Sequence, residues 1–329
     1  MEIKNENLWI KNSDCIDFLK EIPDDSVDLI LTDPPFGLGE KKFDDLHYAR
    51  NNKTVVNGYK EAPNTLSYED WTYEWISEFN RILKKNGSIF IVSGWTNEAD
   101  IQYAFRRNGN FRLINHLIWN YTFGVYTSSK FVTSHYHILY YAKKEGKQYF
   151  NKNAYHDETH KNEKKGSCVY DDLQDVIKIN KEYKPNQEKN CNTLPMKLIE
   201  KLIKHTTKPG DVVLDIFSGG FTTEFASLKL RRKAWGCEIN KNSCKKYFPI
   251  LKKYNDFYET EEDIVGYKKT DLLVNQGKPL TNKTKKDIVN YFNKQKGSKK
   301  ERIANTANHF KRGTFSISRV IKSFESKQY

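Results

Sequence analysis

Residues 211–240 read "DVVLDIFSGGFTTEFASLKLRRKAWGCEIN". Two apolar runs in this stretch are separated by a glycine-containing turn and a helix-like segment. The run that ends at Asp215 predicts a buried strand, and Gly219 and Gly220 predict a turn. A helix and a second strand that ends at Glu238 follow. Because strands that alternate with helices are typical of a parallel α/β sheet, this stretch predicts the fold class of the chain.

The same stretch has the features of a nucleoside site. Glycine lets a ligand approach the backbone, and an acid at the end of the second strand can hold ribose hydroxyls. Asp215 and Glu238 occupy the two strand ends, but the dinucleotide pattern G-x-G-x-x-G is absent. An adenosyl ligand without phosphates therefore suits the site better, although a purely structural strand–turn–helix would have the same pattern.

A second unusual stretch is "LTDPPFGL" (31–38), which follows the strand-like run "VDLILT" (27–32). Pro34 and Pro35 fix φ and lack backbone N–H groups, so they end the strand in a stiff loop. The amine on adenine C6 is a weak nucleophile, because its lone pair is delocalised into the ring. The Asp33 carboxylate and the Pro34 carbonyl could accept both N–H bonds and free that lone pair. Phe36 offers a flat surface on which a flipped-out base could stack.

Together these two stretches resemble the S-adenosylmethionine-dependent amino-methyltransferases of DNA, over roughly residues 7–255. The D-P-P-[YF] form is typical of enzymes that methylate adenine N6, and the order of the motifs is similar to the permuted β group. The resemblance implies a Rossmann-like class I methyltransferase sheet, mostly parallel, with S-adenosylmethionine as cofactor and double-stranded DNA as substrate. It implies that the catalytic residues are Asp33, Pro34, Pro35 and Phe36.

The resemblance also extends to three shorter segments. "NSDCIDFL" (12–19) is similar to the segment that contacts the cofactor adenine, "CNTLPMKLIEKLI" (191–203) to the helix before the cofactor strand, and "LIWNY" (117–121) to the strand beside the target base. The cofactor residues so implied are Asp14, Cys15, Thr193, Pro195, Asp215, Phe217, Gly219, Thr222 and Glu238, and the target-base residues are Trp119 and Asn120. Two positions depart from the family, with Phe221 in place of a glycine and Leu194 in place of a common lysine.

Most of the formal net charge of +13 lies near the C-terminus. Residues 271–329 contain 14 Lys and Arg against 4 Asp and Glu, a net charge of +10, which leaves +3 for the first 270 residues. A basic tail points to nucleic acid, although a solvated tail would have the same composition. Three predicted helices, the turn "KRGT" (311–314) and a Ser316 cap indicate a helix-turn-helix-like module. Its predicted DNA-binding residues are Lys311, Arg312, Ser318, Arg319 and Lys322, with a dimerisation arm or plain packing helices as alternatives.

The remaining patterns divide the chain. Apolar runs predict strands at 88–93 and 137–142. Trp71, Trp75, Phe79 and Leu83 predict an amphipathic helix within 67–87 that Gly87 stops, with the tryptophans in the core. Pro195 predicts the first turn of another helix. We predict a catalytic half at 1–142, a target recognition region at 143–192, a cofactor-binding half at 193–258 and a basic helical DNA-binding module at 259–329. The region 143–192 and the loop around 40–66 are the candidates for sequence readout.

Composition narrows the class of protein. No charged leader precedes an apolar run, and no run approaches 18 apolar residues, so we expect a cytoplasmic, nucleoid-associated protein without a membrane segment. Five cysteines without a CxxC pair argue against a zinc site or a disulfide framework, and no metal is expected. The predicted function is site-specific adenine-N6 methylation in a restriction-modification system. Cytosine N4 or RNA as the target, or a non-catalytic DNA-binding subunit, are the alternatives. A homodimer and a separately acting cognate endonuclease are both compatible with the sequence.

Overall fold

The computed structural model describes residues 1–36, 67–122, 128–152, 154, 173–180, 194–264, 280–310 and 314–325. The chain divides into two compact units, Met1–Tyr258 and Glu259–Tyr329. The predicted readout loop at 40–66, much of the region 143–192, and the candidate residues Thr193, Lys311 and Arg312 lie outside the described residues.

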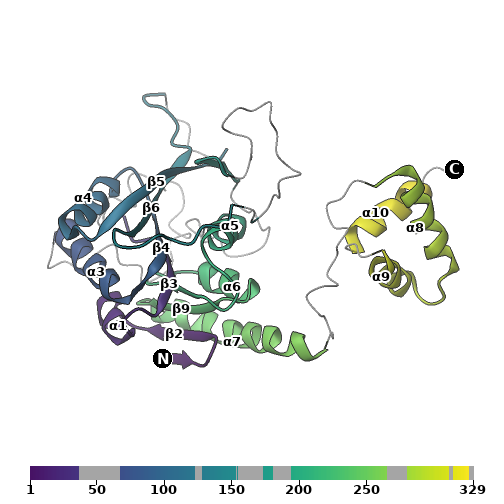
Figure 1. Cartoon of the computed structure of the whole chain (residues 1–329), viewed down its shortest axis with the longest axis horizontal. Coiled ribbons are helices and arrows are strands. Elements are labelled where there is room, and N and C mark those ends of the chain that lie inside the picture. The colour runs from purple at the N-terminus through teal and green to yellow at the C-terminus, as the bar shows by residue number, and fades with distance from the viewer. Residues whose placement is uncertain are drawn as a thin grey trace. The chain divides into compact units, whose positions relative to one another are not determined.

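A sheet forms the centre of the first unit (Figure 1). Within the described residues it has nine strands, in the order β1-β2-β9-β8-β3-β4-β6-β5-β7. The strands are β1 (Glu2–Lys4), β2 (Leu8–Asn12), β3 (Val27–Thr32), β4 (Leu83–Ser93), β5 (Phe111–Asn120), β6 (His135–Lys143), β7 (Val176–Lys178), β8 (Val212–Asp215) and β9 (Lys233–Glu238). The neighbours from β2 through β9, β8 and β3 to β4 are all parallel, and β6 runs antiparallel to β4 and β5. The predicted Rossmann-like, mostly parallel sheet is confirmed.

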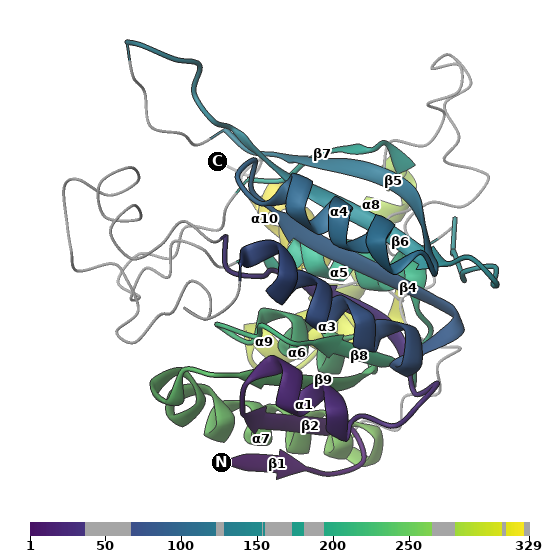
Figure 2. The same cartoon turned by 90° about the vertical axis from the view of Figure 1, so that its left-hand side faces the viewer.

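Helices cover both faces of this sheet. Figure 2 shows α1 (Cys15–Glu21), α3 (Tyr68–Ile82) and α4 (Glu98–Asn108) on the near face, while α5 (Met196–Thr206), α6 (Thr222–Lys229) and α7 (Lys241–Ile264) cover the other. Successive residues of β2 face opposite sides of the sheet. Trp9 packs with the α1 and α3 core, and Ile10 packs with residues of α6 and α7. Side chains that alternate between two covered faces are typical of a strand buried on both sides.

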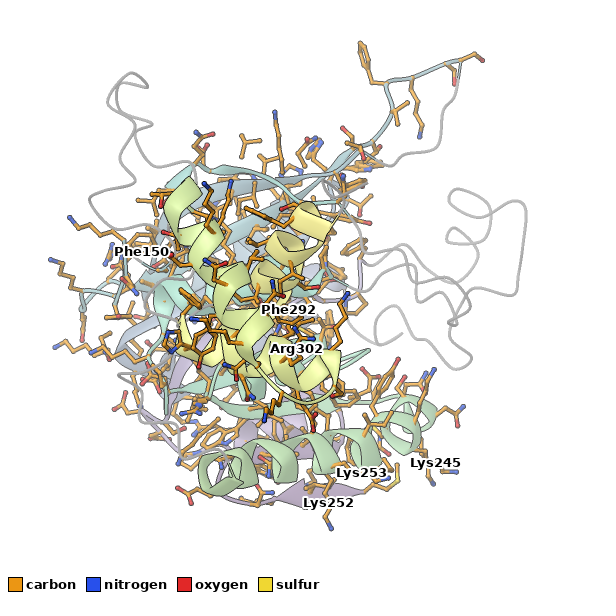
Figure 3. All side chains as sticks on the ribbon, turned by 90° about the vertical axis from the view of Figure 1, so that its right-hand side faces the viewer. Phe150, Lys245, Lys252, Lys253, Phe292 and Arg302 are labelled. Carbon is orange, nitrogen blue, oxygen red and sulfur yellow. The ribbon has the colours of Figure 1, made fainter. Side chains whose placement is uncertain are left out.

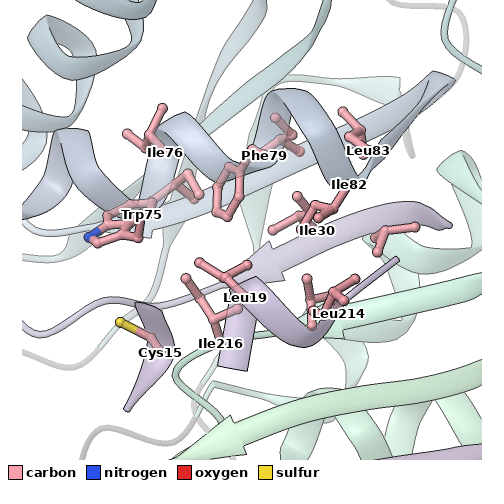
Figure 4. Close-up of a cluster of buried hydrophobic side chains, with 14 of the residues drawn as sticks. Cys15, Leu19, Ile30, Trp75, Ile76, Phe79, Ile82, Leu83, Leu214 and Ile216 are labelled. Atoms are coloured by element: carbon pink, nitrogen blue, oxygen red, sulfur yellow. The ribbon is translucent and has the colours of Figure 1, made fainter. Parts of the chain in front are cut away.

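The core beneath α3 is the largest apolar cluster near the site. Trp75, Ile76 and Phe79 of α3 pack over Leu19 and Ile30, and all five side chains are 0% exposed (Figure 4). Burial of a large apolar side chain stabilises a fold by about 1.5–3 kcal/mol. The prediction that the α3 tryptophans belong to the core is confirmed.

Two predicted helix boundaries near the site are wrong. Helix α3 ends at Ile82, not at Gly87, because Leu83 already pairs with Val27 in the parallel ladder of β3 and β4. Gly87 instead lies inside β4, where an added Cβ would come 2.6 Å from the Leu83 side chain. Pro195 is the N-cap of α5 and not part of its first turn.

The second unit contains the three predicted helices, α8 (Asn282–Lys294), α9 (Lys299–His309) and α10 (Thr314–Glu325). They share a core of Ile288, Phe292, Ala307, Ile317, Val320 and Ile321. The Arg302 guanidinium lies 4.0 Å from the centroid of the Phe292 ring and donates to the Phe292 carbonyl at the end of α8 (Figure 3). The predicted helix cap at Ser316 is wrong, because α10 begins two residues earlier, at Thr314.

The described residues of the second unit do not test the predicted DNA contacts. Ser318 is half-buried on α10, and the side chains of Arg319 and Lys322 on the same helix are not among those described. The helix-turn-helix-like module therefore stays a prediction. No helix among the described residues of the chain is long and apolar enough to span a bilayer.

Candidate active site

The parallel strands bring the predicted site residues to one edge of the sheet. Strands β2, β9, β8, β3 and β4 run in the same direction, so their carboxyl ends meet at this edge. Asp14, Glu238, Asp215, Asp33 and Gly94 lie at or just after these ends. In open α/β sheets, ligands bind outside the carboxyl ends of the strands.

A buried hydrogen bond ties the two sequence motifs together. Thr32 Oγ1, directly before the Asp-Pro-Pro-Phe loop, donates to Asp215 Oδ1 over 2.7 Å, across 183 positions of sequence. The Phe217 N–H donates to the same oxygen over 3.0 Å. Burial raises the pKa of Asp215, while these hydrogen bonds oppose the rise. The loop and the glycine turn are therefore held in a fixed relation.

Glu238 closes the glycine turn from the next strand. Its Oε2 accepts from the Gly219 N–H and its Oε1 from the Asn240 N–H, each over 2.7 Å. Burial raises the pKa of Glu238, and the two N–H donors oppose that rise. A carboxylate has about four acceptor positions, so this side chain retains acceptor capacity for the hydroxyls of a ribose.

Asp14 follows two positions after Asn12, which ends β2 and pairs with Glu238 in the parallel ladder. Asp14 caps helix α1, with Oδ1 accepting from the Ile16 N–H over 2.8 Å, and its side chain is half-buried. Cys15 is only 5% exposed and belongs to the core (Figure 4). Burial raises the pKa of its thiol well above the usual range. Asp14 can thus offer a carboxylate to a ligand, whereas Cys15 contributes packing.

The remaining predicted cofactor residues surround the turn. Phe217 is half-buried, and its ring centroid lies 5.5 Å from that of Trp71 and 5.7 Å from that of Trp75. Thr222 is half-buried at the start of α6, and Pro195 is buried at the start of α5. Leu194, where the family commonly has lysine, packs against the core beneath α5.

Phe221 occupies the glycine position of the family motif without entering the turn. Its backbone is left-handed, with φ 59° and ψ 28°, a conformation that favours glycine. Its ring is 0% exposed and packs at 5.6 Å from the Phe248 ring and 5.8 Å from the Tyr247 ring, both on α7. The ring therefore packs in the core against α7 and is not exposed to a ligand at the turn.

This arrangement predicts a specific order of stability. Phe221→Ala should lower the free energy of unfolding by about 3–5 kcal/mol, because a buried ring is lost. Phe221→Gly should be more stable than Phe221→Ala by about 1 kcal/mol, because glycine has no Cβ penalty at positive φ. Denaturant unfolding measures both differences. Equal stability of the two variants would contradict the left-handed assignment, and a large change in cofactor affinity would contradict the placement of the ring.

Hydrogen bonds from α3 and α4 hold the Asp-Pro-Pro-Phe loop in place. The Tyr68 hydroxyl donates to the Pro35 carbonyl over 2.7 Å, and Asn97 Nδ2 donates to the Tyr68 hydroxyl over 2.8 Å. Asn97 Oδ1 in turn accepts from the Gly94 N–H over 3.0 Å. Sequence reasoning missed Tyr68 and Asn97, because they lie far from the loop in sequence and no local pattern marks them.

The Phe36 ring has a defined seat. Its centroid lies 5.7 Å from that of Tyr136, and an added Cβ at Gly94 would come 3.3 Å from its carbon atoms. Tyr136 stacks on Trp119 at 5.5 Å and 22°. Trp119 is 1% exposed and its indole N–H donates to the Ile179 carbonyl over 2.7 Å, so it supports Tyr136 from within the core. Asn120 Nδ2 donates to the Ser134 carbonyl over 3.1 Å.

Glu224 is a buried acid behind the turn that the sequence reasoning did not use. It is 1% exposed and accepts a short hydrogen bond from the Ser218 hydroxyl. An added Cβ at Gly236 would collide with its carboxylate, so this glycine makes room for it. Burial, and then the charge of Asp215, raise the pKa of Glu224 well above the usual range. No local pattern marks it, because the space for its carboxylate comes from Gly236 on the next strand.

The pH dependence of stability should reveal Glu224. Because its pKa is raised in the folded state, the native protein binds a proton that the unfolded chain releases above its ordinary pKa. Stability is therefore highest below that ordinary pKa and falls by about 1.4 kcal/mol per pH unit until the native group ionises. Glu224→Gln should remove this component and stabilise the protein at neutral pH. Urea unfolding from pH 5 to 8 tests this prediction. Glu145→Gln, at an exposed turn, is the control. Parallel curves of unfolding free energy against pH for Glu224→Gln and the native protein would refute it.

Comparisons with known proteins agree with this geometry. Residues 27–253 match the model of a protein family described as DNA methylase. The type II methyltransferase M.BamHI of Bacillus amyloliquefaciens is 29% identical over 286 residues, which are 81% of this chain and 64% of that protein. The DNA adenine methyltransferase YhdJ of Escherichia coli strain K12 is 30% identical over 254 residues, which are 72% of this chain and 80% of that protein. The structure of PvuII DNA methyltransferase, titled cytosine-N4-specific, covers 77% of this chain and 92% of its own, with 17% identity and a TM-score of 0.56.

Proposed function

This chain belongs to the DNA methylase family, whose members take the methyl group from S-adenosylmethionine, and we propose that it methylates adenine at N6 in double-stranded DNA. The observation that carries the proposal is the hydrogen bond from Thr32 to Asp215, which holds the Asp-Pro-Pro-Phe loop beside the glycine turn. A base bound at the loop and an adenosyl group bound at the turn would therefore lie next to each other.

Polar groups on the cofactor side suit an adenosyl ligand. In the proposed site, Glu238 accepts the ribose hydroxyls, and the Asp14 carboxylate accepts from the adenine. Gly219, whose φ is 51°, lets the ligand approach the backbone. The half-buried Phe217 and Thr222 complete the turn, and Asp215 fixes the turn against β3.

The chemistry at the loop follows from its acceptors. In the proposed site, a flipped-out adenine stacks on Phe36, and its N6 amine donates to the Asp33 carboxylate and the Pro34 carbonyl. Both bonds favour a tetrahedral nitrogen whose lone pair can form the new N–C bond. S-adenosylmethionine supplies the methyl group, with inversion at carbon as its C–S bond breaks. The surplus proton leaves N6 for solvent water after the transfer, so Asp33 serves as a hydrogen-bond acceptor and not as a strong base.

Cytosine N4 is the second candidate for the target. The family model covers enzymes of both kinds, and the PvuII structure of the same fold is titled cytosine-N4-specific. The exocyclic amine of cytosine could use the same two acceptors. We favour adenine because the loop carries Asp33, and because YhdJ, at 30% identity, is named an adenine methyltransferase.

A methyl-transfer assay tests the proposal. The purified protein is incubated with methyl-labelled S-adenosylmethionine and mixed-sequence duplex DNA, single-stranded DNA or RNA. We expect label in duplex DNA, at N6 of adenine, and a large loss of label with Asp33→Ala. A protein that binds S-adenosylmethionine in calorimetry but labels none of these substrates would overturn the assignment. A protein that binds DNA but not the cofactor would be the non-catalytic subunit.

Three parts of this proposal concern partners and context. The protein acts in a restriction-modification system, as the type II naming of M.BamHI suggests, and its cognate endonuclease acts separately. The region 143–192 reads the target sequence, and the basic module at 259–329 adds contacts to the phosphate backbone. Phosphate contacts are salt-dependent, so removal of residues 280–329 should weaken DNA binding most at low salt.

A further inference from the structure

Trp95 is an exception among the tryptophans of this chain. Its side chain is 65% exposed, whereas four others are at most 4% exposed and the fifth, Trp235, is half-buried. An exposed indole leaves a large apolar area in water, and aromatic side chains of this kind are enriched where a protein binds a partner. The exposed indole of Trp95 is therefore a candidate contact for a binding partner.

The backbone around Trp95 is fixed against the Asp-Pro-Pro-Phe loop. The Gly94 N–H donates to Asn97 Oδ1 over 3.0 Å, which closes a turn around Trp95, and Asn97 is 0% exposed. The same Asn97 donates to the Tyr68 hydroxyl, which donates to the Pro35 carbonyl. The turn and the loop thus form one hydrogen-bonded unit.

The distance from Trp95 to the proposed base site is short. The Phe36 ring lies against Gly94, where an added Cβ would come 3.3 Å from two ring carbons. Consecutive Cα atoms are about 3.8 Å apart, so the residue after Gly94 lies directly beside the seat of the Phe36 ring. The hydrogen-bonded turn therefore places the backbone of Trp95 beside the proposed base site, and its side chain is 65% exposed.

We propose that Trp95 contacts the DNA substrate by stacking its indole on the face of an unstacked nucleobase. This inference rests on the proposed function, because only the removal of a target base from the duplex creates such a face beside the loop. Two bases share this chemistry, the flipped adenine itself and the neighbouring base of the same strand that the flip leaves unstacked. Stacking between aromatic side chains and bases tolerates any base, so Trp95 adds affinity and not sequence readout.

The test compares three variants on a duplex that the native protein methylates. Trp95→Ala should lower kcat/KM for DNA about 10- to 100-fold, the range that one base–aromatic stack provides. Trp95→Phe should retain most of the activity, because a smaller ring still stacks. Tyr103→Ala, which removes a 45% exposed ring from α4, should change nothing.

Controls separate stacking from folding. All three variants should keep the native Tm and the native Kd for S-adenosylmethionine, because Trp95 is mostly exposed. A kcat/KM of Trp95→Ala within twofold of the native value would overturn the inference, as would a loss that follows a fall in Tm. Absence of methyl transfer by the native protein would instead refute the proposed function, so the two failures are distinguishable.

A duplex with an abasic target identifies the stacked base. If the indole stacks on the flipped adenine, the native protein and Trp95→Ala should bind this duplex equally, because the stacking partner is missing. If it stacks on the neighbouring base, Trp95→Ala should bind this duplex about 10- to 100-fold more weakly. Equal binding of both proteins to the abasic duplex and to the intact duplex would overturn the inference in either form.

Discussion

Replacement of Asp33 by alanine should lower kcat for methyl transfer about 10²- to 10³-fold, the loss usually seen when one preorganised polar partner is removed from an active site. The adenine amine would keep only the Pro34 carbonyl as an acceptor, and its lone pair would remain delocalised. Asp33 follows β3 directly, and Thr32 holds that strand end to Asp215, so the rest of the site should keep its geometry. Single-turnover kinetics with excess protein measure the effect.

Asp33→Asn provides the matched comparison. Its amide oxygen can still accept one hydrogen bond, but without the charge that roughly doubles the strength of such a bond. Its kcat should lie between those of the native protein and of Asp33→Ala. Both variants should bind S-adenosylmethionine with the native Kd. Activity of Asp33→Ala within tenfold of the native value would show that the amine finds its acceptor elsewhere.

Replacement of Glu238 by alanine should raise the Kd for S-adenosylmethionine about 10- to 100-fold. Hydrogen bonds to a charged acceptor contribute about 1.5–3 kcal/mol, and each 1.4 kcal/mol is a tenfold change in affinity. The variant also loses the acceptor of the Gly219 and Asn240 N–H groups, which loosens the turn. Isothermal calorimetry measures the change directly.

Two further measurements make the Glu238 prediction specific. Asp17→Ala, which removes a side chain 71% exposed from the nearby helix α1, should leave the cofactor Kd unchanged. Because burial raises the pKa of Glu238, the native protein should bind the cofactor more weakly as the pH falls and this carboxylate gains a proton. A Kd of Glu238→Ala equal to that of the native protein would contradict the prediction, and the ribose contact would belong to another residue.

Much of this fold could be predicted because its strands are continuous apolar runs with clear ends. The run Val27–Thr32 is a strand with the predicted bounds, and Asp215 and Glu238 end β8 and β9 as expected. The boundary between α3 and β4 could not be predicted, since it depends on the pairing of Leu83 with Val27, 56 positions earlier. Pairing between distant segments overrides the local signal of Gly87.

The candidate site, like the fold, could be predicted only in part. Its acids and glycines could be found because their chemistry marks short motifs. The residues that hold those motifs together could not, since Thr32, Tyr68 and Asn97 act through contacts between distant segments. The sequence shows Phe221 only as a departure from the family motif, and the structure places its ring against α7. Local sequence thus reveals the chemistry, and tertiary contacts reveal its support.

The most direct test of the account identifies the methylated base. Duplex DNA is incubated with the purified protein and S-adenosylmethionine, digested to nucleosides and analysed by mass spectrometry, with Asp33→Ala as the control. We expect N6-methyladenine from the native protein and a large loss of it from Asp33→Ala. N4-methylcytosine as the product, or N6-methyladenine at equal rates from both proteins, would contradict it.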